Sequence, residues 1–413
     1  MFEAFRERDY RRFWVTQFIS NIGSWMQSVA QGWLVYRLTD SPFLLGFVAF
    51  AASAPAVVLM LPGGVVADQF DRKRVVAFSQ IAQASSALFL SIMVFTNRVT
   101  VWQIIGAAVV VGVAQSFSAP AFQAMIADLL DDRARLPNAI AMNSLQFNSS
   151  RVIGPLIAGA TLSLWGPGLA FLANAVSFLP LVWVLMRTPN RQRPLEGSSA
   201  MRDRLVEGFR FVLADRLVLV LLGVVGFASL FAYPIVNMMP VVARFTFSND
   251  AAGLGYLMAA VGTGALSGAL ALSIRTPSHE RSMFLISATL TLNGFALAGV
   301  GLFRSRAVVV ALLVAAGMSM VVCMALCNTT LQRRLPDFIR GRVLSMYTFA
   351  FFASIPIGNL SAGLVAEKAG IRAALLMLGA GALATAAAAT WAIRTVPPEW
   401  GPLPKQPEPQ SAG

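Results

Sequence analysis

Twelve long apolar blocks separated by short charged segments are the feature that most constrains how this chain folds. A helix needs roughly 20 mostly apolar residues to cross a bilayer, and only a helix satisfies all its backbone hydrogen bonds within such a segment. Charged residues make up 12% of the 413 residues, and the mean hydropathy is +0.68, whereas soluble domains are about 25% charged. The sequence therefore predicts an all-α membrane protein with 12 transmembrane helices at about 13–36, 43–67, 75–95, 102–127, 138–164, 168–187, 217–242, 252–274, 282–303, 307–331, 341–366 and 371–394.

The distribution of basic residues predicts which side of the membrane each loop faces. The N-terminus, the even-numbered loops and the C-terminal flank hold 24 Lys and Arg, and the odd-numbered loops hold 7. Loops rich in Lys and Arg stay in the cytoplasm, so we expect a multi-pass protein of the plasma (cell inner) membrane with both termini cytoplasmic. The net charge of +13 is spread between hydrophobic blocks, which argues against nucleic acid as a partner. The expected surroundings are the lipid bilayer.

The longest connection, which is rich in Arg and Pro, divides the chain into two halves. We expect an N-terminal six-helix bundle at 1–187, a cytoplasmic linker with an amphipathic helix at 188–216, a C-terminal six-helix bundle at 217–395 and a disordered cytoplasmic tail at 396–413. Three glycines recur 204 positions later in the second half, where Gly154, Gly159 and Gly166 correspond to Gly358, Gly363 and Gly370. Two related bundles about an axis along the membrane normal would place a substrate site between them near mid-membrane.

Several kinds of chemistry are missing from the sequence. None of the three lysines follows a glycine, as a P-loop requires, and the chain contains one histidine, His279. The two cysteines, Cys323 and Cys327, lie inside one apolar block. We therefore expect no metal, no cofactor and no enzymatic activity. Any work would draw on ion or solute gradients, or the process would be passive.

A stripe of polar residues runs along the first apolar block. Its members are spaced by 4, 3, 4 and 3 positions, which places them on one face of a helix. They are Gln17, Asn21, Ser24, Ser28 and Gln31, with Trp25 and Gln27 beside them. This pattern predicts a cavity wall that offers amide groups and aromatic surface to a solute. The alternative is that these side chains bond neighbouring helices to one another.

Arg151 lies near the middle of the fifth apolar block. A guanidinium at this depth needs water or a partner, and the blocks contain no Asp or Glu near mid-membrane. Two kinds of partner are open: the amides of Asn143, Gln146 and Asn148, or an anionic group of a substrate. Tyr233 and Asn237 in the seventh block are further candidates for the cavity wall.

The segment from Gly64 to Arg74 resembles the cytoplasmic loop signature of the major facilitator superfamily, Gly-x3-Asp-Arg-x-Gly-Arg-Arg/Lys. Gln69 replaces an Arg of that signature, and Asp71 replaces a Gly. The resemblance implies the major facilitator fold of two pseudo-symmetric six-helix bundles. It also implies a gate at the cytoplasmic side, for which we assign Gly64, Asp68, Arg72, Lys73 and Asp128.

Other segments extend the resemblance along the whole chain. The motif Ser150-x3-Gly154-Pro155-x3-Gly159 resembles the Gly-Pro motif in the fifth helix of facilitator antiporters, although an ordinary small-residue packing face is an alternative. Residues 136–144 with Phe147-Asn148 and Arg151, and Pro336-Asp337 with Arg340-Gly341-Arg342-Val343, are similar to the enterobactin-exporter-like branch, which includes drug and macrolide exporters. The resemblance implies alternating access and proton-coupled antiport of a small amphiphilic compound, drug-like or siderophore-like.

These observations lead to a set of expectations about function. The protein is expected to be a monomeric secondary transporter with a small-molecule substrate and the proton as coupling ion. Members of the branch often carry an acidic residue near Ser24, and this chain has none, so coupling would fall to Asp68, Asp128 or Asp40, or be absent. A metabolite importer on the same fold and a non-transporting sensor are the alternatives. The expected substrate contacts are Gln17, Asn21, Trp25, Gln27, Gln31, Asn143, Arg151, Tyr233 and Asn237.

Overall fold

The computed structural model describes residues 3–188, 209–247, 251–274 and 277–395, which contain helices and no strands. The expected linker lies largely outside these residues, and the expected tail lies wholly outside them. In chain order the elements are η1 (Glu3–Arg6), α1 (Arg8–Thr39), α2 (Pro42–Gln69), α3 (Arg72–Phe95), α4 (Val101–Asp128), η2 (Arg133–Arg135), α5 (Leu136–Leu164), α6 (Pro167–Arg187), α8 (Arg216–Ala232), α9 (Pro234–Asn237), α10 (Met239–Phe247), α11 (Ala251–Ile274), α12 (His279–Leu302), α13 (Arg306–Arg334) and α14 (Asp337–Arg394).

Nine helical stretches of the described residues are long and apolar enough to cross a membrane. Helices α1 and α5, with 32 and 29 residues, are also long enough, but they are not among the nine. These two helices carry the polar stripe and Arg151, so they are less apolar than the nine stretches because they hold the candidate site residues. The all-α membrane fold is confirmed, and the number of 12 transmembrane helices stays a prediction.

Side chains of short polar residues fix where several helices begin. The side chain of Ser41 accepts a hydrogen bond from a backbone N–H in the first turn of α2, and Asp71 does the same for α3. Thr100 and Gln103 form a reciprocal capping box at the start of α4. Such caps satisfy backbone donors that have no partner within the helix. Asp71, the departure from the facilitator signature, therefore has a structural role as the N-cap of α3.

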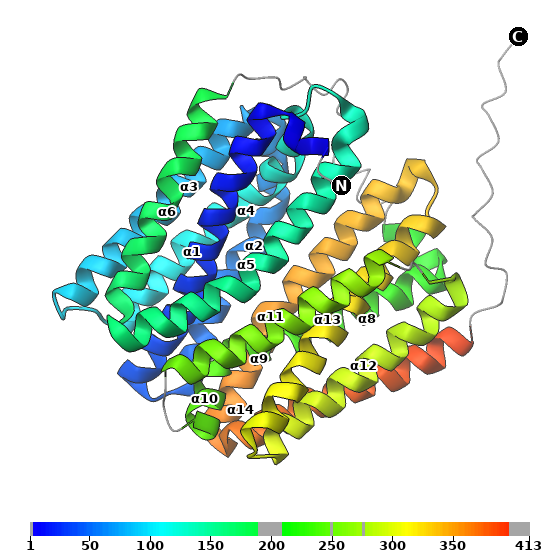
Figure 1. Ribbon diagram of the computed structural model, residues 1–413. Helices are drawn as coiled ribbons and strands as arrows, with labels where there is room; N and C mark the ends of the chain where they lie inside the picture. Colours follow the sequence, from blue (N-terminus) through cyan, green and yellow to red (C-terminus); the bar gives the residue numbers. More distant parts are fainter. Residues whose placement is uncertain (1–2, 189–208, 248–250, 275–276, 396–413) are drawn as a thin grey trace, which may run out of the picture.

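The helices form two bundles, α1–α6 and α8–α14 (Figure 1). In the first bundle α1 packs on α5 and α6, α2 on α4, and α3 on α4 and α6. In the second bundle α8 packs on α14, α11 on α13, and α12 on α13 and α14. The bundles meet mainly where α2 packs on α14 and where α5 packs on α11.

Pairs of glycines mark both of these contacts between the bundles. A Cβ added at Gly159 in α5 would lie 3.1 Å from the Cα of Gly255 in α11, and one added at Gly46 in α2 would lie 3.0 Å from the Cα of Gly363 in α14. The repeat detected in the sequence includes Gly159 and Gly363, which thus hold equivalent places. The two contacts are related in the way expected of two similar bundles.

A matching pair of turns supports the same repeat. Gly166 separates α5 from α6 with φ +79°, and Gly370 divides α14 with φ +84°. A residue with a Cβ is strained at positive φ, whereas glycine has none, so glycine is favoured at both turns. Helix α14 therefore consists of two helical segments joined at Gly370.

Polar contacts between the bundles gather at one end of the molecule, which we call the outer end. Asp40, at the end of α1, forms an ion pair with Arg244 of α10. Glu367 of α14 accepts hydrogen bonds from the Ser41 hydroxyl at 2.9 Å and from the Phe43 N–H at 3.2 Å. The bundles diverge from there toward the inner end, where the described chain begins (Figure 1). The structure is thus closed at its outer end.

Candidate functional site

The centre of the candidate site is Arg151, whose side chain is buried between the bundles. The guanidinium lies over the ring of Trp25, with its central carbon 5.6 Å from the ring centroid. Tyr233, at the junction of α8 and α9 in the other bundle, interacts with Arg151 electrostatically. The predicted cation thus lies over one predicted aromatic residue and is influenced by the other, which belongs to the second bundle.

Further aromatic rings support this centre from both sides. Phe147 meets Trp25 in an edge-to-face contact at 5.9 Å between ring centroids. Phe351 of α14 meets Tyr233 in the same geometry at 5.0 Å. Edge-to-face pairs hold rings in defined orientations. Phe147 and Phe351 are not among the site residues predicted from the sequence, because the chain has 29 Phe residues and their spacing does not indicate which of them face the site.

A small cavity of about 100 Å³ lies between the bundles toward the outer end. Helix α1 contributes Ser28 and Gln31 to its wall, and the second bundle contributes Asn237 and Met258. The Asn237 amide also donates to the Asn359 side chain at 2.9 Å. The remaining wall is mostly apolar. Gln31 and Asn237, predicted independently from two halves of the chain, thus share one cavity.

The inner part of the polar stripe is held by its own hydrogen bond. The Gln17 amide donates to the side-chain oxygen of Asn21, one turn later on α1, at 2.9 Å. Gln17 is buried and Asn21 is half-buried. The side-chain oxygen of Gln17 has no hydrogen-bond partner. This pair supplies amide groups on α1 without contacting the second bundle through any described hydrogen bond.

Two predicted contacts lie away from this centre. Gln27 accepts a hydrogen bond of 2.6 Å from Asn174 of α6, within the first bundle. Asn143 of α5 accepts a hydrogen bond of 3.4 Å from the Tyr10 hydroxyl near the inner end of α1. The alternative reading of the polar stripe, bonding between neighbouring helices, therefore describes Gln27. Neither residue adjoins Arg151 through a described contact.

The residues assigned to the gate form two contacts at the inner end of the first bundle. Arg72, which is buried, pairs with Asp128 at 2.9 Å and donates to the Ala67 carbonyl oxygen at 3.3 Å. Lys73 donates to the Thr188 carbonyl oxygen at 2.6 Å. These contacts tie α3 to the ends of α2, α4 and α6. The side chain of Asp68 lies outside the described part of the structure.

Gly64, the glycine of the same signature, has open space around it. A Cβ added there would meet nothing within 4 Å. In a structure closed at its outer end, this glycine is not part of a close helix contact.

The Gly-Pro motif of α5 contacts two other helices at close range. A Cβ at Gly154 would lie 2.5 Å from the Cβ of Trp25 and 2.9 Å from the Ile22 carbonyl oxygen, both in α1. The Pro155 carbonyl oxygen lies 2.8 Å from the position of an added Cβ at Gly255 in α11. Gly154 thus sets the position of Trp25, while Pro155 and Gly159 adjoin the second bundle.

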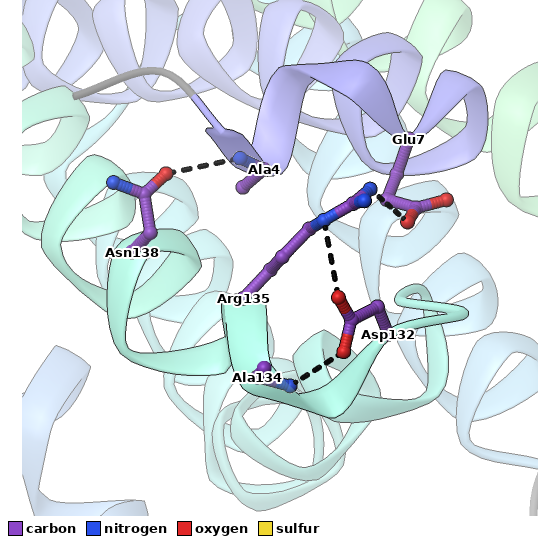
Figure 2. A network of polar contacts seen from close by, with 6 residues as sticks. All are labelled: Ala4, Glu7, Asp132, Ala134, Arg135 and Asn138. Atoms are coloured by element: carbon purple, nitrogen blue, oxygen red, sulfur yellow. Dashed lines mark hydrogen bonds and ion pairs between the residues drawn. The ribbon is translucent and has the colours of Figure 1, made fainter.

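The N-terminal segment forms a polar clasp that the sequence did not suggest (Figure 2). Glu7 pairs with Arg135 at 2.6 Å, Arg135 pairs with Asp132 at 3.4 Å, and the Ala4 N–H donates to Asn138 at 3.0 Å. These contacts join η1 and the start of α1 to the α4–α5 connection. They anchor the inner ends of the two helices that carry Trp25 and Arg151.

Two hydrogen bonds, one buried and one partly buried, extend this anchoring along α1 and α5. The Tyr10 hydroxyl donates to the Ala139 carbonyl oxygen at 2.8 Å, and the Trp14 indole N–H donates to the Met142 carbonyl oxygen at 3.0 Å. Burial raises the pKa of the Tyr10 hydroxyl, so Tyr10 stays a protonated donor at physiological pH. In the sequence, the charged residues at the N-terminus indicate only the side of the membrane on which it lies. The hydrogen bonds to α5 cannot be predicted in this way, because their acceptors are backbone carbonyl groups, which every residue has.

Known proteins that resemble this chain are transporters. It is 26% identical over 367 residues to the multidrug efflux pump Tap of Mycolicibacterium fortuitum, with 86% of this chain and 88% of that protein covered. It is 24% identical to the staphyloferrin A transporter of Staphylococcus aureus, with 89% and 92% covered. The crystal structure of a D-xylose–proton symporter superposes with a TM-score of 0.74 at 12% identity, covering 96% of this chain and all of that one; it shows the fold alone.

The family model matches residues 1–408, nearly the whole chain, and describes a transmembrane secretion effector. Membership accounts for the loop signature, the repeated glycines and the two bundles seen in the structure. It also confirms that the protein is a multi-pass membrane transporter of small molecules and not an enzyme. The chain belongs to the transmembrane secretion effector family of the major facilitator superfamily.

Proposed function

We propose that this transporter exports a small amphiphilic organic compound, drug-like or siderophore-like, across the plasma (cell inner) membrane by alternating access. The observation that carries the proposal is the contact of buried Arg151 with Trp25 and its electrostatic interaction with Tyr233 of the other bundle, together with the cavity that Gln31 and Asn237 line between the bundles. A site shared by two bundles changes its exposure when one bundle rocks against the other. The name of one relative, a multidrug efflux pump, supports outward movement, and that of the staphyloferrin A transporter supports a siderophore-like compound.

The contacts at the two ends suggest how the cycle runs. With the outer end closed, substrate reaches the site from the inner end, which faces the cytoplasm if the basic loops are cytoplasmic. The polar contacts that close the outer end, Asp40 with Arg244 and Glu367 with Ser41, are exposed. Exposed ion pairs contribute about 0–1 kcal/mol each, so they break at little cost when the outer end opens.

Proton coupling is part of the proposal and falls to acidic groups at the gates. Asp128 at the inner end is paired with Arg72, and Asp40 at the outer end is paired with Arg244. Protonation of Asp40 would weaken the ion pair that joins the two bundles at the outer end, which would link proton exchange to opening; the pair of Asp128 and Arg72 joins α4 to α3 within the first bundle. In this scheme a monomer completes the cycle, with both termini in the cytoplasm.

Transport into inverted membrane vesicles tests the direction and the energy source together. An imposed proton gradient is expected to drive accumulation of a fluorescent amphiphilic dye in inverted vesicles that contain the protein. An ionophore that collapses the gradient should stop it, and vesicles from cells without the protein provide the background. Gradient-driven uptake into right-side-out vesicles, with none into inverted ones, would instead identify an importer.

A further inference from the structure

The charge of Arg151 has no counter-charge among the described side chains. It forms none of the ion pairs or hydrogen bonds of the described residues, and its exposed fraction is 6%. All described acidic side chains lie at or near helix ends or at the turn of Gly370, and Asp128, Asp215 and Glu367 already have partners. The guanidinium is thus an isolated positive charge at the centre of a transporter.

The amides that were the alternative partners form their described hydrogen bonds with groups other than Arg151. Gln146 donates to the Trp14 carbonyl oxygen at 2.8 Å, and Asn148 donates to the Ser144 carbonyl oxygen at 2.8 Å. Asn143 accepts from the Tyr10 hydroxyl. None of these amide contacts reaches Arg151, so a structural network of amides does not account for this residue.

The contacts that Arg151 does make are too weak to offset its burial. A cation over an aromatic ring is stabilised only modestly, even when desolvated. Burying an unpaired ion costs more than this, even after relaxation and water penetration. The contact with Trp25 and the electrostatic interaction with Tyr233 therefore leave a deficit, and an anion placed between the bundles would remove it.

The surroundings of Arg151 define what kind of anion fits. Trp25 and Phe147 from the first bundle, and Tyr233 and Phe351 from the second, form two pairs of rings in edge-to-face contact. Trp25 of the first bundle lies against the guanidinium, and Tyr233 of the second bundle interacts with it electrostatically. A guanidinium binds a carboxylate through two parallel hydrogen bonds, while the rings accept an apolar body.

We propose that the transported compound is an amphiphilic anion, whose carboxylate binds Arg151 and whose apolar or aromatic part lies against Trp25 and Tyr233. This inference rests on the proposed function and narrows its substrate class. It implies that the site prefers an anion over a neutral or cationic compound of the same shape. Because Trp25 and Tyr233 belong to different bundles, the bound anion joins the two halves at the centre of the cycle.

Binding of three matched probes to the purified full-length protein in nanodiscs tests this assignment. The probes are naphthoate, naphthamide and naphthylmethylammonium, measured by isothermal titration calorimetry. Hydrogen bonds to a charged group contribute about 1.5–3 kcal/mol each, so naphthoate should bind about tenfold or more tightly than naphthamide. The Arg151→Gln variant should lose this preference, and Arg151→Lys should keep part of it, since the ammonium retains the charge but not the planar fork.

Controls separate this inference from the proposed function. Arg98→Gln, in an exposed loop, should behave as the parent protein, and thermal unfolding shows whether each variant is folded. Equal affinity of the parent for all three probes, or an unchanged preference in Arg151→Gln, would overturn the inference even if dye export is observed. An Arg151-dependent preference for naphthoate without outward transport in vesicles would support the anion site and refute export.

Discussion

Glycine at position 46 decides how closely α2 and α14 approach each other at the outer end. A Cβ at this position would lie 2.5 Å from the Asn359 carbonyl oxygen, a distance that backbone atoms cannot accept without moving apart. Overpacking of this kind costs about 1–3 kcal/mol. We therefore expect Gly46→Ala to shift the population toward the outward-open state.

Labelling from outside the cell measures this shift. A cysteine at Val48, which is buried in the closed state, should react with a membrane-impermeant maleimide about fivefold or more faster in the Gly46→Ala background. Gly106→Ala is the matched control, because a Cβ there meets nothing within 4 Å. Equal labelling rates in both backgrounds would show that this glycine contact does not hold the outer end closed.

Gln27 and Gln31 lie one turn apart on α1 but have different surroundings. Gln27 bonds Asn174 inside the first bundle, whereas Gln31 lines the cavity between the bundles. Gln27→Leu leaves the Asn174 amide unpaired, which costs about 1–3 kcal/mol, so it should lower the unfolding temperature and leave the affinity for substrate unchanged. Gln31→Leu should weaken the affinity for substrate and leave the unfolding temperature unchanged. If Gln27→Leu instead has a normal unfolding temperature and weakened binding, Gln27 contacts the substrate and this prediction is wrong.

Gln27 and Gln31 also show which parts of the site can be predicted from the sequence. The spacing of polar residues predicts a cavity wall on α1, and in the structure Gln31 of this stripe lines a cavity together with Asn237. Because polar residues lie on several faces of α1, the spacing does not indicate which of them face the cavity and which face a neighbouring helix. The partner of Gln27 is 147 positions away in the chain, and nothing in the local pattern identifies Asn174.

At the scale of elements, the clasp at the N-terminus sets how α1 and α5 lie relative to each other. The side chains of Glu7 and Arg135 are 13% and 27% exposed, and they pair at 2.6 Å. A double-mutant cycle with Glu7→Gln and Arg135→Gln should give a coupling energy of about 1 kcal/mol, at the upper end for pairs near a surface. Unfolding in detergent, monitored by circular dichroism, supplies the four free energies.

The pair of Asp71 and Arg74 is the matched control for this cycle. Its atoms are 3.7 Å apart, and the Arg74 side chain is 76% exposed, so its coupling energy should be close to zero. Equal coupling energies in the two cycles would mean that the clasp contributes no more than an ordinary surface contact.

The elements themselves were largely predictable, because long apolar blocks can only be membrane helices. The exceptions have physical causes. The seventh block is broken into α8, α9 and α10 near Pro234 and Pro240, since proline removes a helical hydrogen bond. Helices α1 and α5 extend past the apolar blocks, because the clasp and the hydrogen bonds of Tyr10 and Trp14 stabilise their polar inner turns.

At the scale of the whole molecule, the central claim is that the two bundles rock about the site at Arg151. The repeat of glycines predicted the symmetry of the two contacts, but the sequence gives no sign of which end is closed. That depends on long-range pairs such as Asp40 with Arg244, which lie 204 positions apart. Closure at the outer end is one state of the cycle, and the opposite state must also be populated during transport.

Distances between spin labels at both ends test this claim most directly. One pair of labels, at Arg74 and Arg281, spans the inner ends of the two bundles, and another, at Arg98 and Arg304, spans the outer ends; all four positions are exposed. The distances are measured by double electron–electron resonance, with and without substrate and a proton gradient. Cys323 and Cys327 are replaced so that only the introduced cysteines carry labels. The account predicts that the inner distance shortens while the outer distance lengthens. Distances that stay fixed, or that change in the same direction at both ends, would contradict it.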